Sequence, residues 1–507
     1  MPHRAFTVLT SADRAASNCI WGAPRQTRQV HEETVDVGSD RETAAESPDP
    51  RRWRILAVTL VVGFMSLLDV TIVNVAIPSI QEGLESSAST VQWVVSGYAL
   101  AFGLTLVAGG RLGDAYGRRR LMVVGLLGFV ASSAAVGFAP NAELVVAARL
   151  LQGASAGLLT PQSTGLIQQL FSGAERGRAF GYFGLTVSLA SATGPLLGGL
   201  IIGAAGEDVG WRLLFLVNVP IGLVALVAIA RLVPGRDPEA QPERIDLPGA
   251  ALLGLCVLCL LYPLVSVESG AREPLVLLVG VPLFAWAFGR WEHRVRRRGH
   301  APLLDLDLLR RLPGYGSGLL IGTLYFTGFT GVFLTASVWL QDSRQVSALH
   351  AGLLLTPFAL GSAVSSPLAG RLVSRVGRPL TVVAISSMMA AVALAAVVGP
   401  GQTTSDLWWG LAPFLLLAGL GGGAVVSPNI TLTLQEVPPR MGGAAGGALQ
   451  TGQRIGSSLG AALLMTIYQV VTASHGGDAG FRTALATALA VLSLALTAAV
   501  VSWRTTR

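Results

Sequence analysis

The chain has 507 residues, of which 51% are hydrophobic and only 13% carry a charge, with a formal net charge of +7. A soluble globular protein carries roughly 25% charged residues, so this composition excludes an ordinary soluble domain. All of the positive charge comes from arginines scattered between apolar runs, which argues against a nucleic-acid-binding surface.

Residues 1–50 differ from the rest because they are polar and contain no apolar core segment. The apolar stretch "FTVL" is too short to be the core of a signal peptide. We expect these residues to form a disordered cytoplasmic tail.

Fourteen apolar runs follow the tail, and we expect each to be a spanning helix of an all-α integral membrane protein. The runs lie near residues 55–80, 91–110, 121–139, 143–170, 179–203, 212–233, 246–266, 274–290, 315–341, 350–370, 379–399, 407–434, 444–471 and 482–503. With the N-terminus inside, 25 of the 36 arginines fall on the cytoplasmic side and 4 in outside loops. Cytoplasmic loops hold the excess of arginine, so both termini are predicted to be cytoplasmic.

The first predicted span carries a single acid, Asp69, near its middle. A carboxylate at bilayer depth is costly and marks a transport pathway by default. Because desolvation favours the neutral form of a carboxyl group, Asp69 is a candidate for proton or substrate coupling. The alternative is a structural carboxylate that is paired with an arginine.

A charged segment, "GRLGDAYGRRR", separates the second and third spans, and we expect a short cytoplasmic loop there. Its glycines permit a tight turn and close backbone contact. Asp114 is an acceptor that can meet Arg118 or the positive end of a helix in the other half of the chain. The segment is therefore a candidate gating loop, with Gly110, Arg111, Gly113, Asp114, Gly117 and Arg118 as its residues. The alternative is a loop that only sets the topology.

Arg149 lies near the start of the fourth span, and Gln152 follows on about the same helical face. An unpaired arginine is too costly to face lipid, so this face must meet a cavity or a carboxylate. We expect Arg149 and Gln152 to line a cavity or to meet a carboxylate. A purely structural pair between Arg149 and Asp69 is the alternative, and a loss of activity on mutation would not separate the two.

Two stripes of small residues run along the fifth span, one through Gly194 and Gly198 and the other through Pro195 and Gly199. Small residues at four-residue spacing let neighbouring helices approach closely. Pro195 also permits a bend, because it has no backbone N–H to donate. These four residues can therefore form a bend or a close-packed contact, and the sequence leaves both alternatives open.

Cys256 and Cys259 form a C-x-x-C pair in the seventh span. No second Cys or His pair lies nearby, so we interpret them as small apolar side chains and predict no metal site. A basic segment from Arg290 to Arg311 follows the eighth span and is expected to contact acidic lipid head groups. Its histidines, His293 and His300, are expected to be solvated.

The second half of the chain repeats parts of the first. The segment "GRLVSRVGRPL" echoes "GRLGDAYGRRR" at an offset of 260 residues, with Ser374 in place of Asp114. Internal repeats are common in transporters, whose binding site lies between the halves. In the thirteenth span, Arg454 and Gln450 belong to a polar stripe that we expect to line a cavity. Helix–helix hydrogen bonding is the alternative.

The repeat leaves out the seventh and eighth spans, which look like an insertion. We therefore expect a tail (1–50), a first six-helix bundle (51–235), two linker transmembrane helices (236–290), a basic cytoplasmic linker (291–312) and a second six-helix bundle (313–507).

Six stretches, in order along the chain, resemble motifs of the major facilitator superfamily and of its fourteen-span drug:proton antiporters of the EmrB/QacA type. They are "LDVTIVNVAIPSI", "GRLGDAYGRRR", "RLLQGASAGLLTP", "GPLLGG", "GWRLLFLVNVPIG" and "RIGSSLG", the last departing from the family at Ile455, where glutamine is usual. The resemblance covers residues 55–503. It implies the major facilitator fold, a proton-transfer role for Arg149, a hinge at "GPLLGG" and a latch at the charged loop.

The resemblance implies proton-coupled efflux of small amphipathic drugs or antibiotics across the cytoplasmic membrane of a bacterium, with membrane lipids as further partners. A proton-coupled exporter or symporter of one specific metabolite is the alternative. The chain has no GxxxxGK[ST] loop and no lysine, so we expect no use of ATP, no cofactor and no nucleic acid. A membrane-embedded enzyme would need clustered His, Cys or Asp ligands at bilayer depth, and the sequence gives no sign of them.

Overall fold

The computed structural model describes residues 49–235, 246–268, 273–299, 302–304, 309, 311–403 and 406–505. Fourteen helical segments of this described part are long and apolar enough to cross a membrane, which confirms the predicted all-α membrane architecture. The predicted tail lies outside the described residues except for its last two positions. Residues 236–245 and most of the segment 300–310, including His300, also lie outside them.

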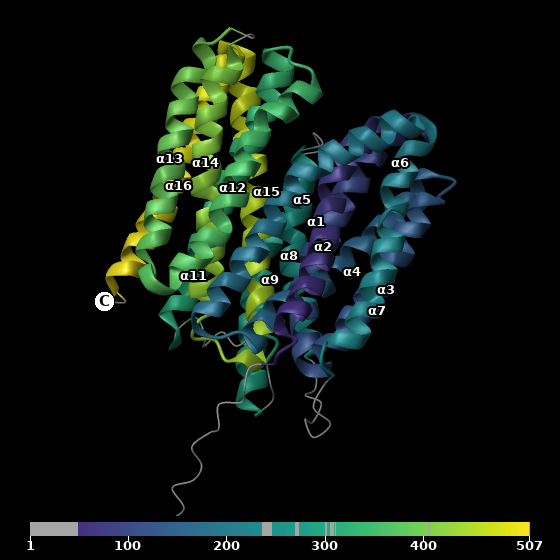
Figure 1. Ribbon diagram of the computed structural model, residues 1–507, viewed down its shortest axis with the longest axis vertical. Coiled ribbons are helices and arrows are strands. Elements are labelled where there is room, and N and C mark those ends of the chain that lie inside the picture. The colour runs from purple at the N-terminus through teal and green to yellow at the C-terminus, as the bar shows by residue number, and fades with distance from the viewer. Residues whose placement is uncertain are drawn as a thin grey trace, which may run out of the picture. The chain divides into compact units, whose positions relative to one another are not determined.

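The first half of the chain forms seven helices that make six spans (Figure 1). They are α1 (Arg52–Gly83), α2 (Ala88–Tyr116), α3 (Arg118–Gly137), α4 (Ala142–Leu170), α5 (Gly173–Ala205), α6 (Glu207–Leu216) and α7 (Asn218–Leu232). Polar side chains start two of them: Ser87 accepts a hydrogen bond from the Thr90 N–H at the start of α2, and Asn141 accepts one from the Leu144 N–H at the start of α4.

The linker spans and the second half follow in order. The linker has α8 (Leu247–Glu268), the short helix η1 (Glu273–Val279) and α9 (Gly280–Arg297). The second half has α11 (Pro313–Val338), η2 (Trp339–Ser343), α12 (Ala348–Val376), α13 (Pro379–Val398), η3 (Gly399–Gly401), α14 (Leu407–Thr433), η4 (Pro439–Met441), α15 (Gly442–His475) and α16 (Gly477–Thr505). Because α9 ends at Arg297, the predicted basic linker begins as a continuation of this helix.

The internal repeat is visible in the packing of the two halves. Helix α12 begins and ends 260 residues after α2. In the first half Gly153 of α4 packs on the backbone of Tyr98 in α2, and in the second half Gly419 of α14 packs on the backbone of Phe358 in α12. A glycine at the crossing lets two helices approach closely. Both halves therefore have a glycine at the equivalent helix crossing.

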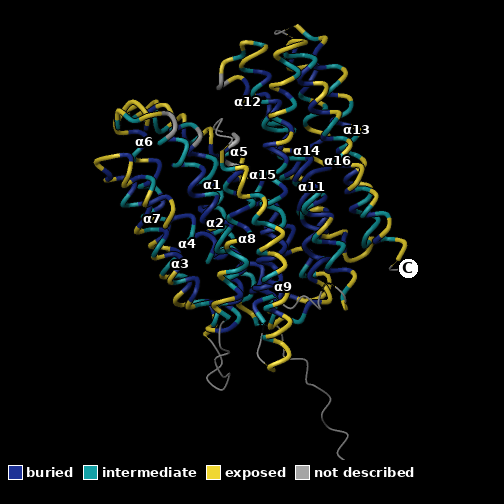
Figure 2. Tube along the Cα trace, turned by 180° about the vertical axis from the view of Figure 1, so that it is seen from behind, coloured by how far each residue is buried: buried dark blue, intermediate teal, exposed yellow. Residues whose placement is uncertain are grey.

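The two halves meet through equivalent helix pairs, α5 with α12 and α2 with α15. Gly177 of α5 lies against Gly370 of α12, and Gly110 of α2 lies against Gly443 of α15. Helix α8 packs on both members of the second pair, and its Tyr262 stacks on Trp93 of α2 at 5.7 Å. The linker helices therefore cover the α2–α15 contact, and α9 is the least buried of the spans (Figure 2).

Candidate functional site

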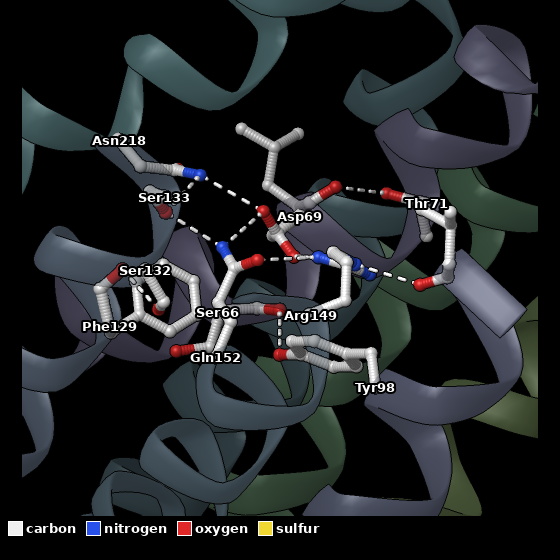
Figure 3. A network of polar contacts seen from close by, with 12 residues as sticks. Ser66, Asp69, Thr71, Tyr98, Phe129, Ser132, Ser133, Arg149, Gln152 and Asn218 are labelled. Atoms are coloured by element: carbon white, nitrogen blue, oxygen red, sulfur yellow. Dashed lines mark hydrogen bonds and ion pairs between the residues drawn. The ribbon is translucent and has the colours of Figure 1, made fainter. Parts of the chain in front are cut away.

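The centre of the site is an ion pair between Asp69 of α1 and Arg149 of α4 (Figure 3). Each residue is about 1% exposed, so the pair lies inside the first bundle. The guanidinium donates to Asp69 Oδ2 through Nη1 and to the carbonyl of Val94 through Nε at 2.8 Å. The structure thus brings together the two charged residues that the sequence singled out at bilayer depth.

The other oxygen of Asp69 is held by amides. Gln152 Nε2 donates to Asp69 Oδ1 at 2.9 Å, and Asn218 Nδ2 of α7 donates to the same atom at 3.0 Å. Ser133 of α3 accepts from Gln152 at 2.7 Å and lies 3.4 Å from Asn218. Helices α1, α3, α4 and α7 therefore contribute to one hydrogen-bond network around a single carboxylate, whose side chains are drawn in Figure 3.

This network suits a charged carboxylate, because Arg149, Gln152 and Asn218 all donate to Asp69. A proton on Asp69 would remove the charge that balances Arg149, and the pair would weaken. Arg149 would keep its contacts with the Val94 carbonyl, the Gln152 Oε1 atom at 2.8 Å, and the rings of Tyr98 at 4.2 Å and Phe215 at 5.6 Å. The guanidinium thus has buried partners besides the Asp69 carboxylate.

Aromatic rings connect this network to the second half. Tyr98, which lies under Arg149, stacks on Phe102 at 6.1 Å, and Arg454 of α15 lies over the Phe102 ring at 4.6 Å. A guanidinium over an aromatic face is an attractive contact. Arg454 thus faces the first half across the α2–α15 contact. The amide of Gln450 is buried and has no hydrogen-bond partner within the described residues.

Four residues of this network were not predicted from the sequence: Tyr98, Phe102, Ser133 and Asn218. Asn218 did leave a signal, because it is a polar residue inside the apolar stretch "GWRLLFLVNVPIG". Ser133 and the two rings left none, since serine and aromatic residues are common in spanning helices and only the fold brings them to Asp69.

The predicted gating loop is not a loop. Helix α2 continues to Tyr116 and α3 begins at Arg118, so Gly117 alone separates them, with a φ of 97° that favours glycine. The prediction of a short loop was wrong because Gly110 and Gly113 serve helix packing. A Cβ at Gly110 would overlap the carbonyl of Gly443, and one at Gly113 would overlap the side chain of Gln162.

Asp114 makes both of the contacts that the sequence allowed. Its Oδ1 accepts from Arg118 Nη2 at 3.0 Å and from the Gly443 N–H at 3.1 Å, and its Oδ2 accepts from the Ala444 N–H at 2.8 Å. Gly443 and Ala444 are in the first turn of α15, where helical N–H groups are unpaired and the helix dipole is positive. Arg118 also donates to the Pro439 carbonyl at 2.7 Å, and Arg111 is buried nearby in α2.

The two stripes of α5 have different surroundings. Gly194 and Gly198 pack on α1, where a Cβ at Gly194 would overlap Thr71 and one at Gly198 would lie 3.2 Å from Val75. Pro195 and Gly199 are exposed, and a Cβ at Gly199 would meet nothing within 4 Å. One stripe is therefore close packing, and the other has no partner helix in this structure.

No group of metal-ligating side chains occurs in the part of the chain that the structure describes. Cys256 and Cys259 are free thiols, and Cys256 lies 3.6 Å from the Val281 carbonyl of α9. His293 is exposed on α9.

Comparison with known proteins gives matches over most of the chain. The sequence profile of the Major Facilitator Superfamily matches residues 59–461. The chain is similar to the puromycin resistance protein pur8 of Streptomyces alboniger, with 38% identity over 86% of each chain. It is 36% identical to a probable actinorhodin transporter of Streptomyces coelicolor over 89% of this chain and 79% of the relative. In fold it is similar to the human organic anion transporter MFSD10, with a TM-score of 0.65, 19% identity, and coverage of 89% of this chain and all of the other.

Proposed function

Because this chain belongs to the Major Facilitator Superfamily, we propose that it exports small amphipathic drugs or antibiotics across the cytoplasmic membrane in exchange for protons. The class of cargo is supported by two relatives whose names specify actinorhodin and puromycin. Proton coupling is supported by the Asp69 network, which is the observation that carries the proposal.

The proposed cycle starts with a proton that reaches Asp69 and displaces Arg149. The freed guanidinium stays buried, held by the Val94 carbonyl and the face of Tyr98. When the proton leaves toward the cytoplasm, Asp69 regains its charge and the ion pair forms again. A buried charge without a counter-charge is costly, so the position of Arg149 depends on the protonation of Asp69.

Helix α2 transmits this change in the proposed mechanism. Its rings Tyr98 and Phe102 lie between Arg149 and Arg454, and its last turn carries Asp114, which holds α15. Both contacts join α2 to α15 across the two halves. A shift of Arg149 on Tyr98 therefore acts on the same helix pair whose cytoplasmic ends must separate for cargo to enter.

The test uses full-length protein in sealed liposomes with a pH-sensitive dye inside, and puromycin with a panel of amphipathic antibiotics as probes. We expect transport of a probe against its gradient, and proton movement in the opposite direction, only while a pH gradient or membrane voltage is present. The Asp69→Asn variant should lose both signals. Ser132→Ala is the matched control, because Ser132 is next to Ser133 but its hydroxyl contacts only the carbonyls of Gly128 and Phe129. Transport at an undiminished rate with both gradients collapsed would contradict the proposal.

A further inference from the structure

A second polar site lies at the same end of the molecule as Asp114, on the other contact between the halves. It is a pocket of about 510 Å³ lined by Trp53 of α1, Arg178 and Tyr182 of α5, and Arg371 of α12. Its volume falls in the range of about 300–1,000 Å³ that is usual for small-ligand sites. The pocket is adjacent to the close approach of Gly177 and Gly370, so its wall combines residues of both halves.

The two arginines give this pocket an unbalanced positive charge. Within the described residues, neither Arg178 nor Arg371 forms an ion pair or a side-chain hydrogen bond. The nearest candidate acid in sequence, Glu175, is engaged by Arg52 through two contacts of 3.1 Å. Two guanidinium groups on one pocket are well suited to a phosphate, which accepts several charge-assisted hydrogen bonds.

The surroundings of the pocket favour a lipid as the source of that phosphate. Leu368 and Leu372 flank Arg371 on α12 and are 54% and 46% exposed, as expected for side chains that face acyl chains. Trp and Tyr, which form the other two walls, are the residues enriched at membrane–water interfaces. Anionic lipids in the cytoplasmic leaflet attract basic sites, and basic pockets between spanning helices bind their head groups.

We propose that this pocket binds the head-group phosphate of an anionic phospholipid from the cytoplasmic leaflet. The bound phosphate bridges Arg178 of the first half and Arg371 of the second. It therefore stabilises the arrangement in which the cytoplasmic ends of α5 and α12 are in contact. This site is separate from the Asp69 network and does not depend on the identity of the cargo or on proton coupling.

The experiment titrates purified full-length protein with phosphatidylglycerol and follows bound lipid by native mass spectrometry. Removal of both guanidinium groups in the variant Arg178→Gln/Arg371→Gln should weaken binding about tenfold, since it removes charge-assisted hydrogen bonds. Arg375→Gln is the matched control, because Arg375 is exposed on the same helix but does not line the pocket. It should change binding by less than about twofold.

Two further titrations identify the source of the phosphate. Zwitterionic phosphatidylcholine should bind more weakly than phosphatidylglycerol, and inorganic phosphate should not displace the lipid. Displacement by inorganic phosphate would overturn the lipid assignment in favour of a free anion. An equal loss of binding in Arg178→Gln/Arg371→Gln and in Arg375→Gln would show diffuse surface attraction and would also overturn it. If the double variant does not fold, the single variants Arg178→Gln and Arg371→Gln answer the same question.

Discussion

The Asp69 carboxylate accepts hydrogen bonds from the guanidinium of Arg149 and from the amides of Gln152 and Asn218. The guanidinium also has other hydrogen-bond partners. This arrangement explains why sequence alone left two roles open for Asp69 and Arg149. Their burial and pairing are what a structural ion pair needs, and the proposed proton coupling uses the same two residues. The two roles differ in what happens when both charges are removed together.

Neutralising both charged residues distinguishes a structural role from a role in proton coupling. Asp69→Asn alone leaves Arg149 buried without a counter-charge and should lower the free energy of unfolding by about 3–5 kcal/mol. The double variant Asp69→Asn/Arg149→Gln removes both charges and should recover most of that stability. We expect it to remain inactive in proton-driven export, because no titratable group is left at the centre of the network.

Thermal unfolding of the purified variants measures their stability. Transport in liposomes made from the same preparations measures proton-driven export. A double variant that is stable and also exports normally would show that the pair is only structural.

At the scale of single helices, the two faces of α5 give a matched comparison. Gly194→Ala should destabilise the protein by about 1–3 kcal/mol, because the added methyl group overlaps Thr71. Gly199→Leu should leave the unfolding temperature close to that of the wild type, because a side chain there has open space in this structure. We expect it nevertheless to slow export, if the exposed stripe packs against another helix in the opposite conformation. Wild-type transport by Gly199→Leu would rule out that role.

The end of α2 yields a prediction about conformation. Asp114→Asn weakens the acceptor that holds the first turn of α15, and charge-assisted hydrogen bonds of this kind contribute about 1.5–3 kcal/mol. The cytoplasmic ends of α2 and α15 should therefore separate more often, and the ratio of separated to closed molecules should rise by about tenfold or more. Ser374→Ala is the matched control in the repeat, because the Ser374 hydroxyl contacts only the carbonyl of Arg371 in its own helix.

Spin labels at Arg120 of α3 and Val383 of α13, which are exposed near the starts of these helices, report the separation as a distance distribution. An unchanged distribution in Asp114→Asn would show that this contact does not hold the two halves together.

Much of this architecture could be predicted from sequence because the determining signals are local. Span number, the repeat and the buried charges Asp69 and Arg149 follow from hydropathy and from the cost of charge in lipid. The gating segment was misjudged because glycine is ambiguous: at Gly117 it ends a helix, whereas at Gly110 it makes room for a helix of the other half. Only the tertiary structure distinguishes these two uses.

For the whole molecule, the distribution of arginine predicts which end faces the cytoplasm. Asp114, Arg178 and Arg371 should all lie at that face, as the proposed mechanism and the proposed lipid site require. The loops that follow α13 and α14 provide a direct test of this orientation. The predicted topology places Gly401, after α13, outside and Arg440, after α14, inside.

Alkaline phosphatase fused after Gly401 should be active in cells, since the enzyme folds only outside the cytoplasm, and the same fusion after Arg440 should be inactive. A fluorescent protein at the C-terminus should be fluorescent. The opposite pattern would reverse the orientation and place the latch at the outer face.

The Asp69 network draws all of its polar side chains from the first bundle, and the described residues of the second bundle contain no buried acid that would form a counterpart. Its acids, Asp342, Asp406, Glu436 and Asp478, are few, and the structure buries none of them. The two halves thus share their packing but differ in where they bury acidic side chains. If proton coupling resides in this network as proposed, substitutions in the second bundle can change which compounds are exported while every contact of Asp69 stays intact.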